Sequence, residues 1–461
     1  MLAPRAGFAA TQSHRGEMMF DLVGAGFGPS NLALAVALTE HNAHAEPDET
    51  VIGHFLERQA QFGWHRGMLI DDATMQVSFL KDLVTLRNPS SEFSFLCYLQ
   101  SKGRLVDFIN HKSLFPLRVE FHDYFAWAAE QVSAQVSYGT DVTCVRPVRS
   151  AGGRITALDV HASDAAGERV LRTRNVVLGT GLRARLPEGV TEGERIWHTS
   201  SLLHRVRALG EGAQPQRFVV VGAGQSAAES AAYLHRTFPQ AEVHAVFSRY
   251  GYSPADDSAF ANRIFDPAAV DDFYAAPEQV KRKLMDYHGS TNYSVVDLDL
   301  IDDLYHREYQ EKVLGHRRLF LNNASRLVAA EPFADRAGVV IESLITGDRT
   351  ALDADVVVYA TGYHEADGLA LLGDLAGLCL RDEQGRPQVD RDYRVRTTPE
   401  LECGIYLQGG TEHSHGITSS LLSATAVRVG EMLDSIRARR EAGTEAGAAH
   451  AGLAVPTAVG S

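Results

Sequence analysis

The chain has few cysteines, and they do not form a paired motif. Its 461 residues include four cysteines, and the sequence holds no Cys-x-x-Cys pair: Cys97, Cys144, Cys379 and Cys403 lie far apart. This spacing favours a reducing compartment and argues against a dithiol redox centre. We expect these side chains to be packing residues.

Long apolar runs and clusters of basic residues are also absent. No stretch approaches eighteen consecutive apolar residues, and residues 1–18 lack the continuous apolar segment of a signal peptide. The chain carries 58 acidic and 44 basic side chains, for a net charge of −14, and its Lys and Arg do not gather with aromatic residues. These patterns predict a cytoplasmic protein that binds neither nucleic acid nor membrane surfaces.

The chain does have two glycine-rich segments, Gly24-Ala25-Gly26-Phe27-Gly28-Pro29 and Gly222-Ala223-Gly224-Gln225-Ser226-Ala227. Each follows a short apolar run and precedes an alanine-rich stretch with helical spacing, which predicts strand, tight turn and helix. Glycine lets the backbone turn sharply and approach a pyrophosphate, whose charge then meets unpaired N–H groups at the helix N-terminus. Two such units predict two dinucleotide sites, and therefore electron transfer between two cofactors.

The residue that follows the second strand of each unit indicates which dinucleotide binds there. The apolar strand predicted over 51–56 ends in Glu57, whose carboxylate is suited to an adenosine ribose, as in FAD. The strand predicted over 242–247 ends in Ser248 and Arg249. A hydroxyl and a guanidinium suit the 2′-phosphate of NADPH, whereas an acid would repel it. Alternatively, Arg249 is a solvated surface charge.

A buried strand ending in a small-Thr-Gly turn occurs twice, over 175–181 and 355–363, once before and once after the second glycine unit. We therefore predict an α/β fold with two Rossmann-like domains, the second inserted into the first, plus a smaller, mainly helical substrate-binding region. The expected boundaries are a disordered leader at 1–18, an FAD-binding domain at 19–208 and 353–440, an NADPH-binding domain at 209–255 and 322–352, the helical region at 256–321, and a disordered tail at 441–461.

Several further segments carry a family likeness: Trp64-His65, Met75-Gln76-Val77-Ser78-Phe79-Leu80-Lys81, Asp256-Asp257-Ser258-Ala259-Phe260-Ala261-Asn262, Thr291-Asn292-Tyr293-Ser294, Ala360-Thr361-Gly362-Tyr363, and His415-Gly416 followed by Ser420-Leu421-Leu422-Ser423. With them, the chain resembles the class B flavin monooxygenases from about residue 20 to about residue 440. Within that class it is most similar to the N-hydroxylating L-ornithine N5-monooxygenases of siderophore biosynthesis, which have lysine N6-monooxygenase relatives.

The resemblance assigns residues to both cofactors. Those implied for FAD are Gly24, Gly26, Gly28, Pro29, Asn31, Glu57, Trp64, His65, Gln76, Val142, Thr361, Gly362, Ser420, Leu421 and Leu422. Those implied for NADPH are Gly222, Ala223, Gly224, Gln225, Ser226, Ser248, Arg249, Asn292, Tyr293 and Ser294. Strict alignment places Ser248 where ornithine hydroxylases often have Arg, so the 2′-phosphate partner is either Ser248 or Arg249.

The resemblance also implies an amino-acid site. Lys81 would bind the substrate α-carboxylate, with Asn262, Asn292, Phe265 and Ser423 around the substrate, and Lys81, Asn292 and Gln76 as the catalytic set. Lys81 sits in an otherwise apolar run, where an unpaired ammonium is costly to bury, although a surface acid such as Asp82 is an alternative partner. Asn262 and Asn292 are alternatively turn or cap residues.

The implied reaction is a hydroxylation. NADPH would reduce the flavin, O₂ would give a C4a-hydroperoxyflavin, and the side-chain amine of L-ornithine would become N5-hydroxyornithine for a hydroxamate siderophore or related product. Lysine or a diamine is the alternative substrate, and a flavin-binding redox sensor is the non-enzymatic alternative.

The resemblance suggests a homo-oligomer, dimer or tetramer. No metal site is expected, because His413 and His415 have no third ligand nearby.

Overall fold

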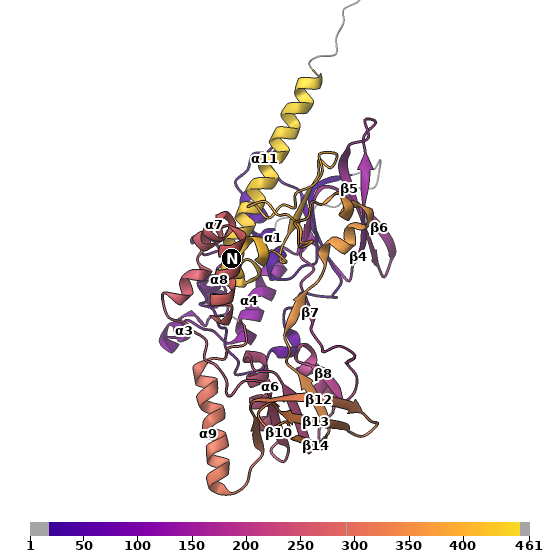
Figure 1. The fold of residues 1–461 in the computed structure, drawn as a ribbon. Coiled ribbons are helices and arrows are strands. Elements are labelled where there is room, and N and C mark those ends of the chain that lie inside the picture. Colours follow the sequence, from indigo (N-terminus) through magenta and orange to yellow (C-terminus); the bar gives the residue numbers. More distant parts are fainter. Residues whose placement is uncertain (1–17, 292, 452–461) are drawn as a thin grey trace, which may run out of the picture.

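The computed structural model describes residues 18–291 and 293–451, which form two α/β lobes (Figure 1). The first lobe is built on a seven-stranded sheet in the order β3-β2-β1-β6-β5-β4, with β17 also pairing with β6. Its parallel strands are β1 (Met19–Ala25), β2 (Gly53–Glu57), β3 (Val136–Tyr138), β6 (Gly167–Leu178) and β17 (Gly404–Leu407). The strands β4 (Asp141–Arg149) and β5 (Ile155–Asp164) extend it in antiparallel fashion.

Alternate residues of this sheet supply two apolar cores. Leu22, Phe55 and Val177 face a core shared with the helices α1 (Pro29–Asn42), α4 (Arg118–Gln131) and α11 (Thr425–Ala451). Val23 and Val176 face the other core, shared with β4, β5 and the 3₁₀ segment Gly368–Leu378. Since α1 is buried at eight consecutive residues, it has no polar face, as expected of a helix enclosed on all sides.

The second lobe contains a five-stranded parallel sheet in the order β11-β10-β9-β15-β8. Its strands are β8 (Ile196–His198), β9 (Arg217–Val221), β10 (Glu242–Val246), β11 (Leu319–Asn322) and β15 (Val356–Tyr359). One face carries α5 (Leu202–Ala208), α6 (Gln225–Thr237) and α9 (Leu298–Leu314). The other carries an antiparallel sheet of β12 (Ser325–Pro332), β13 (Ala337–Ser343) and β14 (Arg349–Ala354).

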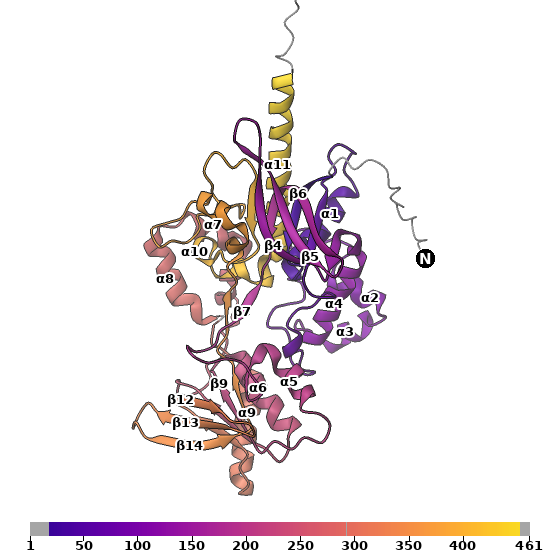
Figure 2. The same cartoon turned by 90° about the vertical axis from the view of Figure 1, so that its right-hand side faces the viewer.

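A short antiparallel ribbon joins the lobes where the chain enters and leaves the second one. It pairs β7 (Leu182–Ala184) with β16 (Tyr363–Glu365), and β7 lies between the two lobes in Figure 2. The insertion of the second fold into the first is confirmed. The expected inner boundaries at 208 and 353 need correction, because β8 and β15 pair within the second sheet. A short, fully buried strand does not itself reveal which sheet it joins.

The region expected to be one helical unit at 256–321 is divided between the lobes. Helix α7 (Pro267–Ala275) packs on α10 (Glu412–His415) of the first lobe and is followed by α8 (Glu278–His288), whereas α9 packs on α6 (Figure 2). Two further helices of the first lobe are α2 (Phe95–Ser101) and α3 (Leu105–His111).

The two ends of the chain were expected to be disordered. Helix α11 continues to Ala451, past the domain end expected near residue 440. Its alanines favour helix even without an apolar stripe. Residues 1–17 of the expected leader and 452–461 of the expected tail lie outside the described residues.

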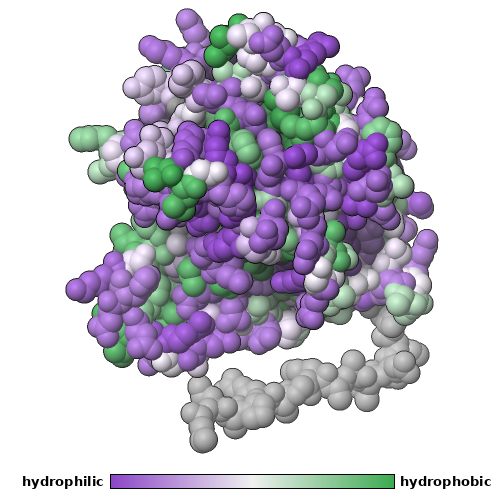
Figure 3. Space-filling model, turned by 90° about the horizontal axis from the view of Figure 1, so that it is seen from below, coloured by the Kyte–Doolittle hydropathy of each residue, from purple (hydrophilic) through white to green (hydrophobic). Residues whose placement is uncertain are grey.

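The surface at the second-lobe end of the molecule is mostly hydrophilic, with apolar side chains in small separate patches (Figure 3). Within residues 18–291 and 293–451, no helix has both the length and the apolar character needed to cross a membrane.

The lobes also touch directly at Gly67, in the 3₁₀ turn Arg66–Met68. A Cβ added there would lie 1.9 Å from the carbonyl oxygen of Ser200, which is backbone and cannot move aside cheaply. We expect Gly67→Ala to destabilise the protein by about 1–3 kcal/mol and to lower its melting temperature in a thermal unfolding assay. The control is Gly193→Ala, where an added Cβ meets no described atom within 4 Å. Equal melting temperatures for both variants would contradict this close packing.

Candidate functional site

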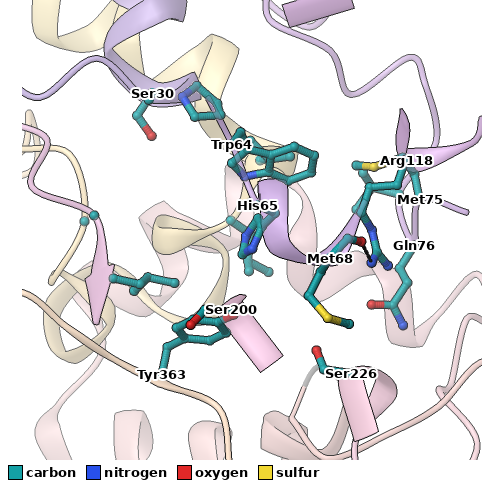
Figure 4. A pocket seen from close by; sticks show the side chains of 18 of the residues that line it. Ser30, Trp64, His65, Met68, Met75, Gln76, Arg118, Ser200, Ser226 and Tyr363 are labelled. Atoms are coloured by element: carbon teal, nitrogen blue, oxygen red, sulfur yellow. Dashed lines mark hydrogen bonds between the residues drawn. The ribbon is translucent and has the colours of Figure 1, made fainter. Parts of the chain in front are cut away.

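A cavity of about 2560 Å³ lies between the lobes and reaches both glycine turns (Figure 4). Its volume exceeds the roughly 300–1,000 Å³ of a typical small-ligand site. Its walls come from the β1–α1 turn, the 57–81 segment, the N-terminus of α6, the 254–266 loop and the 421–423 segment. The space is therefore suited to more than one ligand at a time.

The first glycine turn presents the N-terminus of α1 to this cavity. Gly26 has a positive φ of 87°, and a Cβ there would lie 2.3 Å from the carbonyl oxygen of Gly179. Gly28 caps α1, and no described atom lies within 4 Å of the position of its missing Cβ. Asn31 braces the turn by donating from Nδ2 to the carbonyl of Gly26 at 2.7 Å. The open helix N-terminus fits an anionic pyrophosphate.

Glu57, at the end of β2, lines the cavity and is also tied to this turn. Its Oε2 accepts the backbone N–H of Phe27 at 2.7 Å, and its Oε1 accepts that of Gln59 at 2.8 Å. Each carboxylate oxygen retains a second lone pair for a ribose hydroxyl. Val142, another residue implied for FAD, lines the same cavity.

The second glycine turn is enclosed more tightly. Gly222 has a φ of 142°, and a Cβ there would lie 2.5 Å from the carbonyl oxygen of Ala360. Gly224 caps α6, and its missing Cβ would lie 3.4 Å from the Cα of Ser294. Of the residues expected at this turn, Gln225 and Ser226 line the cavity, whereas Gly222, Ala223 and Gly224 are not part of its described lining.

The two candidates for the 2′-phosphate partner, Ser248 and Arg249, lie outside the described lining of the cavity. Ser248 is exposed, while the guanidinium of Arg249 donates to the carbonyl of Ser294 at 2.7 Å and to Oγ of Ser253 at 3.2 Å. Arg249 thus braces the 293–297 segment against the second lobe. Asn292 lies outside the described residues, and the phenol of Tyr293 bonds Glu412.

Trp64 and His65 lie near the middle of the cavity view in Figure 4. Trp64 packs edge-on against Phe125, with ring centroids 5.4 Å apart. His65 adopts a left-handed backbone conformation with φ of 47°. Burial, with a smaller contribution from the nearby Arg118 charge, lowers the pKa of His65 to about 4. The imidazole is therefore neutral at physiological pH.

Gln76 lies beside Arg118 and Met75 in Figure 4. Its Nε2 donates to Oδ1 of Asp297 at 3.2 Å, and both residues line the cavity. Gln76 therefore already bridges the first lobe to the segment that precedes α9.

The expected substrate residues Lys81, Asn262, Phe265 and Ser423 all line the cavity. The ammonium of Lys81 lies 5.6 Å from the ring centroid of Phe265, and it forms no ion pair among the described residues. Burial lowers the pKa of Lys81, against an opposing contribution from Asp266. Asp82 is not its partner, because that carboxylate accepts the backbone N–H groups of Val84, Thr85 and Phe95.

The side chain of Asn262 also makes a hydrogen bond within the protein. Its Nδ2 donates to the carbonyl of Asp257 at 2.7 Å, as the turn alternative anticipates, while its side-chain oxygen has no bond among the described ones.

Leu421 and Leu422 line the cavity, and the backbone of Ser420 ends the 3₁₀ turn Ile417–Ser420 before them. Thr361 and Gly362 lie outside the described lining and instead bond the chain near Arg185, although the next residue, Tyr363, lines the cavity.

Sequence reasoning missed one polar cluster at the lobe interface: Arg118, Glu229 and Asp297, joined by Gln76 and Gln225. The sequence held one clue to this cluster: Glu229 is the acid in the alanine-rich run Ala227-Ala228-Glu229-Ser230-Ala231. In the structure its side chain is buried.

Two Rossmann-type lobes that share one cavity define an oxidoreductase-type fold with two dinucleotide sites. The family model described as "L-lysine 6-monooxygenase/L-ornithine 5-monooxygenase" matches residues 18–365. The chain belongs to this monooxygenase family.

Three relatives illustrate the match. The chain is 43% identical over 408 residues to an L-ornithine N(5)-monooxygenase of Burkholderia cepacia, covering 87% of this chain and 90% of that protein. It is similar to the ornithine N-hydroxylase of Kutzneria sp. 744 described with reduced FAD, NADP⁺ and L-ornithine, at 48% identity and a TM-score of 0.87, covering 92% and 100% of the two chains. The L-lysine 6-monooxygenase of Pseudomonas syringae gives 32% identity and a TM-score of 0.79, covering 91% and 99%.

The lowered pKa of His65 makes stability depend on pH. Because the unfolded imidazole takes up a proton near pH 6.5 and the folded one only near pH 4, stability falls as the pH drops through this window. The imidazole is also exposed to solvent in the open cavity, which screens the effect and makes the loss from His65 small. We expect His65→Asn, which tolerates the left-handed backbone, to lose less stability than the parent between pH 7 and pH 5 in denaturant titrations. Exposed His44→Asn serves as the control and should behave like the parent. An unchanged pH dependence in His65→Asn would show that His65 titrates alike when folded and unfolded.

Proposed function

We propose that this protein catalyses the FAD- and NADPH-dependent N-hydroxylation of the side-chain amine of L-ornithine. The product is N5-hydroxyornithine, a precursor for a hydroxamate siderophore or a related compound. The observation that carries the proposal is Lys81, whose ammonium lines the cavity between two dinucleotide turns without an acidic partner among the described residues. The names of the relatives support the same substrate.

The described residues fit both cofactors. The open N-terminus of α1 and Glu57 would hold the pyrophosphate and ribose of FAD, and the N-terminus of α6 with Ser226 would hold NADPH. When bound and reduced, the flavin supplies activated O₂ for transfer to an amine. His65, neutral because of its low pKa, brings no positive charge into the middle of the cavity.

Lys81 gives the amino acid its orientation. The ammonium would pair with the α-carboxylate of ornithine, which leaves the side-chain amine to extend away from Lys81. That amine must be neutral to act as a nucleophile, yet an alkylammonium has a pKa of about 10.4, so only about one in 250 is neutral at pH 8. Desolvation beside Leu421 and Leu422 would lower the amine pKa, and the ion pair at Lys81 would offset the binding cost.

Removing the Lys81 ammonium tests this orientation. We expect Lys81→Ala to raise the KM for ornithine at least tenfold, while NADPH oxidation by O₂ without ornithine stays close to that of the parent. Steady-state assays of NADPH consumption and hydroxylamine formation measure both. Lys281→Ala is a matched control, because Lys281 also packs over aromatic rings, at 5.7 Å from those of Phe273 and Tyr274, but outside the described cavity lining. An unchanged ornithine KM in Lys81→Ala would remove Lys81 from the substrate site.

The choice of amine is tested by comparing L-ornithine, L-lysine and putrescine. We expect ornithine to give one hydroxylamine per NADPH, and putrescine, which has no carboxylate for Lys81, to react poorly. Lysine is one methylene longer, a difference worth only about 1–3 kcal/mol, and the similarity to a lysine 6-monooxygenase makes it the second candidate. Equal turnover of putrescine would refute the carboxylate argument. NADPH consumption that yields only hydrogen peroxide with every amine would favour the redox-sensor alternative.

Two further parts of the proposal rest on the sequence and the family resemblance. The scattered cysteines favour action in the cytoplasm, and the resemblance suggests a homo-oligomer. Size-exclusion chromatography with light scattering would measure the oligomeric state.

A further inference from the structure

A buried ion pair across the lobe interface involves α6, the helix whose N-terminus forms the second dinucleotide turn. Nη1 and Nη2 of Arg118, at the start of α4, donate to the two carboxylate oxygens of Glu229 at 2.9 and 2.6 Å. The side chains are only 13% and 5% exposed. Nη1 also donates to the carbonyl of Met68 at 3.1 Å, so the guanidinium is held by a second group besides Glu229.

This pair continues into a polar network along the cavity wall. Nε2 of Gln225, the first residue of α6, donates to Glu229 at 3.0 Å and to Oδ2 of Asp297 at 2.9 Å, and Asp297 in turn accepts from Gln76. The network therefore runs from a first-lobe residue expected near FAD to a second-lobe residue expected near NADPH. Figure 4 shows Arg118, Gln76 and Ser226 around the same space.

The Arg118–Glu229 pair restrains the position of α6 relative to the first lobe more strongly than a surface ion pair would. A bidentate guanidinium–carboxylate contact restrains both distance and orientation, and burial protects it from screening by salt. Glu229 lies one turn beyond Gln225, so a shift of the pair moves the N-terminus of α6 with it. A second ion pair on α6, between Arg236 and Asp72, also joins the lobes but is exposed, with side chains 40% and 62% accessible.

We propose that Arg118 and Glu229 are positioning residues that hold the second dinucleotide turn at the separation from the first that hydride transfer requires. The inference rests on the proposed function. In the affected step a hydride leaves NADPH, giving NADP⁺, and reduces the flavin. The same contact keeps the second lobe closed over the first site. When it is lost, the two electrons of the reduced flavin pass to O₂, which takes up two protons and leaves as hydrogen peroxide, and the amine is not hydroxylated.

The test compares Arg118→Met, Glu229→Gln and the double variant Arg118→Met/Glu229→Leu with the parent holoenzyme. Anaerobic stopped-flow absorbance gives the rate of flavin reduction at saturating NADPH, and aerobic assays give hydrogen peroxide per NADPH and the ornithine KM. Because a displacement of about 1 Å can slow a reaction about 100-fold, we expect reduction to fall by about 10-fold to 100-fold and peroxide to rise. FAD content and the ornithine KM should stay within about twofold, since Lys81 and the first turn are untouched.

The double variant separates positioning from stability. Replacing a buried ion pair with apolar side chains often preserves stability, whereas removing one partner leaves a buried charge. We therefore expect the double variant to melt close to the parent and yet reduce flavin slowly. The exposed-pair variant Arg236→Met, on the same helix, should retain the parental reduction rate and peroxide yield.

Two outcomes would overturn the inference: a folded double variant that reduces flavin at the parental rate with parental peroxide yield, or an equal loss in Arg236→Met. Failure of the proposed function would look different. In that case the parent itself would form no hydroxylamine from any of the three amines, while the flavin reduction rate would still measure the effect of the pair.

Discussion

The arrangement of the molecule depends on one contact that occurs in both lobes, the approach of a glycine turn to the carbonyl at the end of the neighbouring strand. In the first lobe Gly26 packs on the carbonyl of Gly179, just after β6, and in the second Gly222 packs on that of Ala360, just after β15. Any side chain on either glycine would collide with backbone. These contacts fix which strand lies beside each turn, and so fix where each helix N-terminus points.

The same two contacts also determine how the lobes are joined. The residues that follow Gly179 and Ala360 run directly into β7 and β16, the antiparallel ribbon between the lobes. Both dinucleotide turns therefore adjoin the joint, and both helices open toward one cavity. The two-stranded ribbon does not by itself fix the angle between the lobes. The Arg118–Glu229 ion pair and the close packing of Gly67 restrict that angle. A cavity built in this way places a small substrate between two cofactors.

The parts predictable from sequence were those governed by local backbone needs. A glycine turn that packs against backbone and the apolar strand before it are both local sequence patterns, so both turns were predicted. The insertion was predicted from the repeated small-Thr-Gly segment on either side of the second turn. The second of these segments was assigned to the first domain, whereas its strand β15 belongs to the sheet of the second lobe. A short run of buried valines fits either sheet, so the sequence could not distinguish them. The network at Glu229 was missed because its partner lies 111 residues away, and no local pattern specifies such a contact. Arg249 was one of two candidates for a phosphate partner, and its bond to Ser294 depends on a loop whose path the sequence does not reveal.

For the proposed function, the electrostatics of the cavity favour Lys81 over Arg118 as the partner of a substrate carboxylate. Arg118 and Lys81 both line the cavity, and Arg118 is the better partner for a carboxylate in isolation. The guanidinium of Arg118 already donates to Glu229 and to the carbonyl of Met68. A substrate carboxylate would have to displace the buried Glu229 carboxylate to reach this guanidinium. Among the described residues, the Lys81 ammonium has the face of Phe265 and an attractive charge from Asp266 near it, and burial lowers its pKa. A substrate carboxylate would therefore gain more at Lys81 than at Arg118, because it would stabilise the ammonium form of Lys81 and leave the contact between the lobes intact.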